Sequence, residues 1–195
     1  MSQLELANNT VTAYAESIVG LCAAAPERGR AAADRGAWRA VLHGIRPDGD
    51  AGTAKALEDA LAEIAASTGA TKVVGLEARG FILGAPVAVR AGLGFIPVRK
   101  AGKLPGATLS QAYDLEYGSA EIEVHAEDLS AGDRVLVVDD VLATGGTAEA
   151  SLRLIRRAGA ETAGVAVLME LGFLGGRGRL EPALQGAPLE ALLKV

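Results

Sequence analysis

Two adjacent carboxylates directly follow an apolar run in VLVVDDVLATGGT, residues 135–147, and two adjacent glycines begin five residues after the second carboxylate. The apolar run predicts a buried strand, which delivers Asp139 and Asp140 to the edge of a sheet. The turn that follows, with its paired glycines, predicts the start of a helix. In an open parallel sheet, ligands bind beyond the carboxyl ends of the strands, and this turn must lie there. The stretch therefore predicts a ligand site.

The residue types in this turn indicate a phosphorylated sugar as the ligand. Gly145 and Gly146 let the backbone turn sharply, and their N–H groups with the helix N-terminus form an anion cradle. Thr144 and Thr147 add hydroxyl donors. Carboxylates repel phosphate, so the two acids should accept hydrogen bonds from a sugar diol, and the ligand predicted is a ribose 5-phosphate. A helix-entry turn with solvated acids is the alternative, which suits a lone Gly-Gly pair better than this whole stretch.

A second anion site is predicted in GLEARGFILG, residues 75–84, where Ala78, Arg79 and Gly80 directly follow an apolar run. A tight turn there presents an arginine at a strand end, and arginine binds phosphate in a bidentate fashion. Taken alone, the segment is equally well interpreted as a surface arginine at a helix start.

A basic cluster of Arg99, Lys100 and Lys103 stands in a chain whose formal net charge is -5. Residues 100–118 are rich in Gly, Pro, Ser and Thr, so we predict a long loop, and such loops often act as lids. A closing lid would bring cations to an anionic leaving group and exclude water. An ordinary solvated basic loop is the alternative.

These stretches resemble a known family. VLVVDDVLATGGT resembles the motif by which type I phosphoribosyltransferases bind phosphoribosyl pyrophosphate (PRPP), and RKxGKLPxxTLSxxYxLEYG resembles the lid of the adenine-using members. The resemblance covers residues 56–195. It implies transfer of 5-phosphoribosyl from PRPP to adenine, giving AMP and pyrophosphate, by a homodimer. It also implies Mg²⁺ carried by PRPP, with no metal ligands dedicated by the protein.

The same resemblance implies roles for individual residues. The ribose and 5-phosphate would be bound by Asp139, Asp140, Ala143, Thr144, Gly145, Gly146 and Thr147. Pyrophosphate would be bound by Ala78, Arg79, Arg99, Lys103 and Tyr117. The turn with Ala78 and Arg79 often carries a non-proline cis peptide bond in the family. Val141 and Leu171 would sandwich the base, although core packing explains both equally well. Arg79 and Glu116 are the catalytic candidates, Glu116 as general acid–base for the purine.

The elements that must position these residues alternate between strand and helix. We predict helices over 54–67, 81–91 and 147–157, and strands over 72–76, 94–98, 120–125, 134–138 and 164–168. This order is typical of an α/β domain with a mostly parallel central sheet flanked by helices. By the resemblance it is a type I phosphoribosyltransferase fold with a mobile lid loop and a small N-terminal hood.

The hood is where the resemblance fails. We assign residues 1–56 to an N-terminal helix (10–24) and an atypical hood, with loop or marginal structure over 26–53, and residues 57–195 to the core domain. The family's hood resembles F/Y-P-x-P-G-V-x-F-x-D-I-T-P, of which only Gly44–Ile45 survives here. The hood has diverged, or residues 22–56 are an out-of-frame translation of GC-rich DNA. No residue there is assigned to adenine.

Composition bounds the remaining possibilities. A chain of 195 residues, 50% hydrophobic, suits one domain with a sizeable core. The acidic balance argues against a nucleic-acid partner, and no apolar run reaches the roughly 20 residues of a membrane helix. One cysteine and the lack of a basic leader favour the cytoplasm. A phosphoribosyltransferase for another purine, or a PRPP-binding protein without turnover, would share these features.

Overall fold

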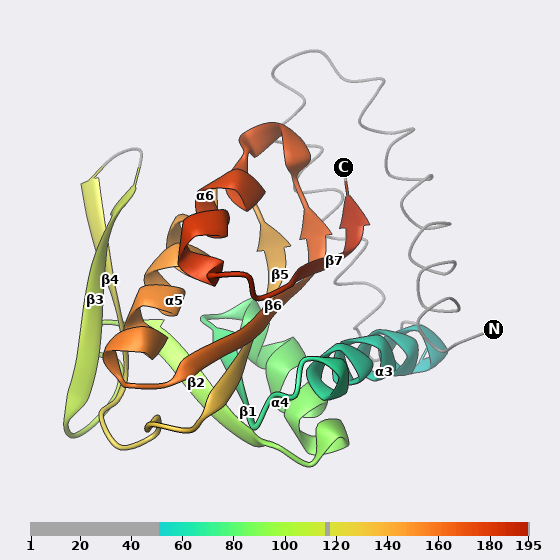
Figure 1. Ribbon diagram of the computed structural model, residues 1–195, viewed down its shortest axis with the longest axis horizontal. Coiled ribbons are helices and arrows are strands. Elements are labelled where there is room, and N and C mark those ends of the chain that lie inside the picture. Colours follow the sequence, from blue (N-terminus) through green and yellow to red (C-terminus); the bar gives the residue numbers. More distant parts are fainter. Residues whose placement is uncertain (1–50, 116–117, 195) are drawn as a thin grey trace.

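The structure is a computed structural model that describes residues 51–115 and 118–194 (Figure 1). One sheet in this part of the chain has seven strands in the order β3-β4-β2-β1-β5-β6-β7. The strands are β1 (Lys72–Leu76), β2 (Gly94–Lys100), β3 (Thr108–Leu115), β4 (Gly118–His125), β5 (Arg134–Leu142), β6 (Glu161–Glu170) and β7 (Leu189–Lys194). The helices are α3 (Ala51–Ser67), α4 (Arg79–Ala91), α5 (Gly146–Arg157), α6 (Gly176–Leu184) and the 3₁₀ turn η2 (Gly172–Leu174).

The centre of the sheet is parallel. Strand β1 pairs in parallel with β2 and β5, and β6 pairs in parallel with β5 and β7. The two antiparallel pairs are β4 with β2 and β3 with β4. The carboxyl ends of β1, β2, β5 and β6 therefore meet at one edge, and the predicted α/β class with a mostly parallel sheet is confirmed.

Helices cover both faces of the sheet, and alternate strand residues divide the core between them (Figure 1). Val73 and Leu136 pack with side chains of α3 and α4, whereas their neighbours Val74 and Val137 pack with side chains of α5 and α6. This division follows from the period of two along a strand. It also explains the nearly continuous apolar run of β5, because a strand covered on both faces needs apolar side chains on both.

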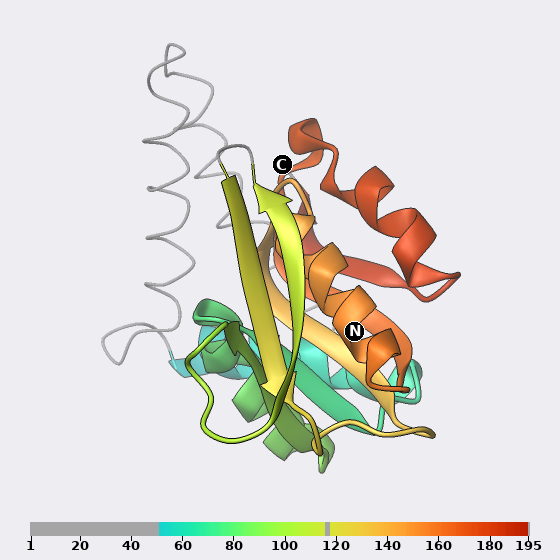
Figure 2. The same ribbon diagram turned by 90° about the vertical axis from the view of Figure 1, so that its left-hand side faces the viewer.

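The sequence predictions hold for the central elements and fail at one long segment. Helix α3 begins at Ala51, so the predicted loop over 26–53 is wrong for its last three residues. The predicted loop over 100–118 is wrong as well, because β3 fills its second half and pairs with the whole of β4. Figure 2 shows these two strands as a long hairpin beside α5. The residues that break the strand pattern, Pro105 and Gly106, lie before β3.

The hairpin joins the rest of the sheet through a short junction. Strand β4 pairs with β2 only at Arg99↔Glu123 and Lys100↔Ile122, whereas its pairing with β3 runs from Thr108↔His125 to Leu115↔Gly118. No element was predicted beyond residue 168, where the structure has η2, α6 and β7. The predicted helix over 10–24, the predicted hood up to residue 50, Glu116 and Tyr117 lie outside the described residues, whereas the last six residues assigned to the hood segment belong to α3.

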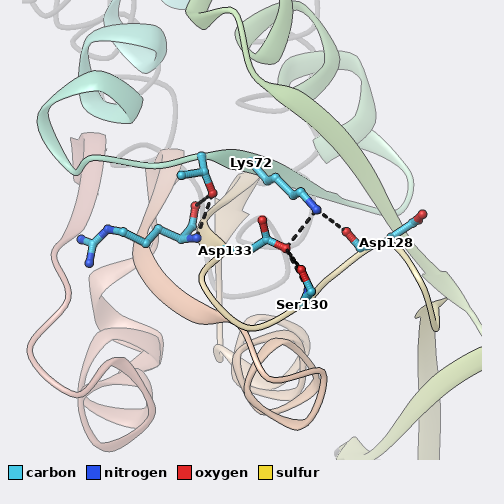
Figure 3. A network of polar contacts seen from close by, with 6 residues as sticks. Lys72, Asp128, Ser130 and Asp133 are labelled. Atoms are coloured by element: carbon cyan, nitrogen blue, oxygen red, sulfur yellow. Dashed lines mark hydrogen bonds and ion pairs between the residues drawn. The ribbon is translucent and has the colours of Figure 1, made fainter.

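The amino ends of β1 and β5 are joined by a polar network (Figure 3). Lys72 Nζ donates to Asp133 Oδ2 at 2.9 Å and to the Asp128 carbonyl at 2.6 Å. The same Asp133 oxygen accepts from the amide and hydroxyl of Ser130 at 2.8 and 3.0 Å. These contacts lower the pKa of Asp133, chiefly through Lys72. The network fixes the two strands at the edge opposite their carboxyl ends.

Among the described residues, no helix is long and apolar enough to span a bilayer.

Candidate active site

A pocket of about 580 Å³ lies at the carboxyl ends of β1, β2, β5 and β6. Eight of the residues singled out from the sequence line it, namely Ala78, Arg79, Asp139, Asp140, Val141, Ala143, Thr147 and Leu171. Lys100, singled out with the basic cluster, lines it as well, and three further residues were missed, namely Glu77, Met169 and Leu174. Glu77 adjoins the predicted Ala78 in the sequence, so the end of β1 already pointed to it. The predicted sites thus come together in one cavity at the expected edge of the sheet.

The two aspartates lie at the end of β5 and differ in their surroundings. Asp140 is buried, and its Oδ2 accepts a hydrogen bond from Arg79 Nε at 3.0 Å. Asp139 Oδ1 accepts from the Asp140 amide at 2.9 Å. Removal of the Asp139 carboxyl from water, together with the nearby Asp140, raises the pKa of Asp139 well above its ordinary value. Both carboxylates line the pocket, where their oxygens can accept hydrogen bonds from a ligand.

The turn after β5 has the backbone that the glycines predicted. Gly145 precedes α5 in the left-handed region, with φ 80°, which a side chain would disfavour. No side chain of the described residues caps this helix start, so the first-turn N–H groups are available to an anion. Ala143 and Thr147 line the pocket, and Thr144, Gly145 and Gly146 lie between them in the turn. Thr147 Oγ1 also donates to the Tyr113 hydroxyl at 3.2 Å, which ties the turn to strand β3.

The turn after β1 presents Arg79 as the first residue of α4. The Glu77–Ala78 peptide bond is cis, as the family resemblance implied. Gly80 packs against β5 so closely that a β-carbon on it would lie 2.7 Å from the Val138 carbonyl oxygen. This contact places the Arg79 turn directly beside the aspartates, and the Arg79–Asp140 bond joins the two.

The basic segment at the end of β2 meets two acidic side chains. Glu77 Oε2 accepts from the Lys100 amide at 2.8 Å and lies 3.4 Å from Arg99 Nε. The buried Glu123 accepts from the amides of Lys103 and Leu104, both at 2.8 Å. The contacts with Lys100 and Arg99 lower the pKa of Glu77, and the hydrogen bond from the Lys100 amide has the largest effect. The pocket wall includes Lys100, while the Arg99 guanidinium donates to the Lys103 carbonyl at 3.1 Å.

One side of the pocket is apolar. Val141 and Leu171 line it, together with Met169 at the end of β6 and Leu174 in η2. Apolar walls of this kind suit the faces of a flat, uncharged ring. Met169 and Leu174 were missed because the predicted strand stops at residue 168, whereas β6 continues to Glu170 and leads into η2.

A larger hollow of about 720 Å³ lies at the opposite edge of the sheet. Its two arginines donate to backbone carbonyls, Arg134 to those of Thr68 and Gly69, and Arg156 to that of Ala183. These arginines brace the backbone, whereas the two aspartates and Arg79 lie in the pocket at the other edge.

Comparison with known proteins agrees with this site. A family model described as a phosphoribosyl transferase domain matches residues 51–182. An adenine phosphoribosyltransferase of Streptomyces coelicolor is 89% identical over 146 residues, which are 75% of this chain and 80% of that protein.

Solved structures show the same likeness. The adenine phosphoribosyltransferase of Rhodothermus marinus superposes with a TM-score of 0.70 at 48% identity, covering 75% of this chain and 81% of that one. The Saccharomyces cerevisiae enzyme, solved with adenine and an imino-altritol bisphosphate, has a TM-score of 0.68 at 39% identity, covering 74% and 81%. With its pocket, its fold and these relatives, the chain belongs to the phosphoribosyltransferase family, among the adenine phosphoribosyltransferases.

Proposed function

We propose that this chain transfers the 5-phosphoribosyl group of PRPP to adenine, releasing pyrophosphate and forming AMP, a reaction of purine salvage. The observation that carries the proposal is the convergence of three groups on one pocket. A glycine turn at a helix start, two aspartates and Arg79 match the phosphate, diol and pyrophosphate of PRPP. The choice of adenine follows the relatives, and the apolar wall of the pocket supports a flat base as the acceptor.

Separate groups of residues would bind the 5-phosphate, the ribose and the pyrophosphate of PRPP. The amides of Gly145 and Gly146 would hold the 5-phosphate at the start of α5. The carboxylates of Asp139 and Asp140, which line the pocket, would accept from the ribose hydroxyls. Arg79 would bind the pyrophosphate, and its bond to Asp140 at 3.0 Å orients the guanidinium beside the sugar. Arg99 and Lys103 would join it through the basic segment.

The chemistry exchanges one bond at the anomeric carbon for another. The bond from this carbon to the pyrophosphate oxygen breaks, pyrophosphate leaves with the electron pair, and a ring nitrogen of adenine supplies the new pair. Positive charge develops on the ribose between these events, and carboxylates fixed beside the sugar stabilise it. The purine must also lose a ring proton. Glu116 is proposed as its acceptor and lies outside the described residues, as does Tyr117, proposed to bind pyrophosphate.

Magnesium is proposed to enter with PRPP. No three His, Cys, Asp or Glu side chains gather into a metal site within the described ranges. The pyrophosphate and hydroxyl oxygens of PRPP are hard donors of the kind that Mg²⁺ prefers, and Asp139 and Asp140 would lie beside them. Bound in this way, the cation would neutralise charge on the leaving pyrophosphate.

A homodimer is proposed as the assembly. Helix α4 exposes two large apolar side chains, Ile82 at 51% and Val89 at 81%. They stand seven residues apart and therefore on one face of the helix. A second copy of this chain would cover that face, beside the Arg79 turn. Light scattering should give twice the chain mass, and Ile82→Glu with Val89→Glu should halve it. A monomeric wild type would refute the dimer.

The cytoplasm is the proposed location, on the grounds of a single cysteine and the class of reaction. Fractionation of cells that express the protein should find it with cytoplasmic markers.

Incubation of the full chain with PRPP, Mg²⁺ and a panel of bases tests the proposed function. Formation of AMP and pyrophosphate with adenine supports it. Turnover confined to another base would replace the substrate, and PRPP binding without turnover on any base would assign the chain to the binding proteins.

A further inference from the structure

A bidentate ion pair between Arg177 and Glu170 joins the two ends of the segment that follows β6. Arg177 Nε donates to the two carboxylate oxygens of Glu170 at 2.9 and 3.1 Å, and Nη2 donates to Oε2 at 2.5 Å. Arg177 Nη1 also donates to the Leu189 carbonyl on β7 at 2.9 Å. The Glu170 side chain is only 8% exposed, so this is a geometrically defined pair rather than a surface contact. Its bonds pin both ends of the loop 170–177 to the sheet.

The first half of this loop forms part of the base wall. The Leu171 amide donates to the Leu142 carbonyl at 2.9 Å, and the chain then enters η2. Leu171 and Leu174, at the two ends of this turn, both line the pocket. The position of the loop therefore sets one side of the space proposed for adenine.

The second half of the same loop supports the phosphate turn from behind. A β-carbon on Gly176 would lie 2.2 Å from the Ala143 carbonyl oxygen and 3.2 Å from the Gly145 amide nitrogen. A β-carbon on Gly145 would in turn lie 2.9 Å from the Gly176 carbonyl oxygen. Only a residue without a side chain fits at Gly176, so the two backbones pack directly on each other.

We propose that Glu170 and Arg177 are positioning residues which hold the base wall and the phosphate turn in a fixed mutual geometry. The inference rests on the proposed function and deepens it, because it names the pair that sets the distance between the two ends of the product AMP. Neither side chain lines the pocket. Their effect is transmitted by Leu171 and Leu174 on one side and by Gly176 on the other. A displacement of the loop by a fraction of an ångström would misplace both.

Binding of two probes separates these effects. Calorimetry gives the dissociation constant of ribose 5-phosphate, which reports the phosphate turn, and that of AMP. The ratio of the two constants reports what the base adds. Arg177→Met, close in length but uncharged, should weaken ribose 5-phosphate by about tenfold and also shrink the ratio by several fold. Arg177→Lys, which keeps the charge without the bidentate fork, should fall between wild type and Arg177→Met.

Three further variants make the pattern specific. Leu174→Ala should shrink the ratio and leave ribose 5-phosphate binding unchanged. Gly176→Ala should weaken ribose 5-phosphate and leave the ratio unchanged. Arg134→Met removes the arginine at the start of β5 that pairs at 3.4 Å with Glu161, the first residue of β6, and should alter neither value. Thermal unfolding of each variant shows whether it remains folded, and the constants are compared for folded protein.

A folded Arg177→Met protein with both values within about twofold of wild type would overturn the proposal. A change in only one value would overturn it too, because the pair would then serve a single wall. Wild-type protein that binds AMP but does not convert adenine and PRPP would count against the proposed function alone. Wild-type protein that binds neither ribose 5-phosphate nor AMP would refute both the positioning proposal and the proposed function.

Discussion

Replacing Asp139 by asparagine should weaken the use of PRPP and, in the protein without ligand, raise stability. Asp139 Oδ1 accepts from the Asp140 amide at 2.9 Å, and its carboxylate lines the pocket, where it can accept a hydrogen bond from a ribose hydroxyl. One hydrogen bond to a charged group is worth about 1.5–3 kcal/mol, and 1.4 kcal/mol corresponds to a factor of ten. The value of kcat/KM for PRPP should therefore fall by roughly 10- to 150-fold.

The stability change has the opposite sign because the pKa of Asp139 is raised in the folded protein, mainly by loss of water and then by Asp140. The contribution of such a group is fully present below its unfolded pKa and is lost as pH rises through the folded pKa. Asparagine cannot ionise and escapes that loss. Asp139→Asn should therefore melt above wild type near pH 8, and the difference should close as pH falls towards the ordinary value of 3.8.

Initial rates over a range of PRPP concentrations and calorimetric melting between pH 4 and pH 8 test both halves. Unchanged PRPP kinetics would show that Asp139 does not face the ribose. A melting temperature below that of wild type at every pH would show that the carboxylate is stabilised rather than desolvated in the folded state, and the reasoning from its surroundings would fail.

Other predictions concern the frame around the site. Asp133→Asn, at the other end of β5, should lower stability by about 1–2 kcal/mol at pH 7 and leave PRPP kinetics unchanged. Since the pKa of Asp133 is lowered, its contribution is present above 3.8 and is lost as pH falls, so wild type and variant should melt together in acid. Gly80→Ala would place a β-carbon 2.7 Å from the Val138 carbonyl, and should reduce kcat/KM by more than about tenfold in steady-state assays. Leu152→Ala, at a fully buried position of α5, should cost about 2–5 kcal/mol in urea unfolding, while the folded fraction keeps its KM.

The central strands and the phosphate turn could be predicted because their signals are local. An apolar run ending in Asp139 and Asp140 carries its burial and its chemistry in consecutive residues, and β5 places both as expected. Strand β3 could not be predicted in the same way. Its residues are stabilised by pairing with β4 and by Leu109 and Tyr113 packing on the core, and these contacts are distant in sequence.

The same reason explains the missed parts of the site. Leu174 enters the pocket because η2 follows the carboxyl end of β6, and Met169 because β6 runs two residues further than the predicted strand. The role of Gly176 depends on a backbone contact with a segment more than 30 residues earlier in the chain. The base wall is therefore the part of the site that depends most on tertiary structure.

The junction of the β3–β4 hairpin with the sheet has a mechanical consequence. Strand β3 has 8 residues, so the hairpin extends roughly 27 Å at about 3.4 Å per residue. Its pairing with β2 is confined to two residue pairs in the half of β4 away from the tip, and Tyr113 nearer the tip bonds to Thr147 of the phosphate turn. Gly118 lies four residues beyond Ile122, roughly 14 Å away, so a rotation of about 10° at the junction would swing the tip through roughly 2 Å. A small change at Arg99 and Lys100 is thereby magnified at the opposite tip.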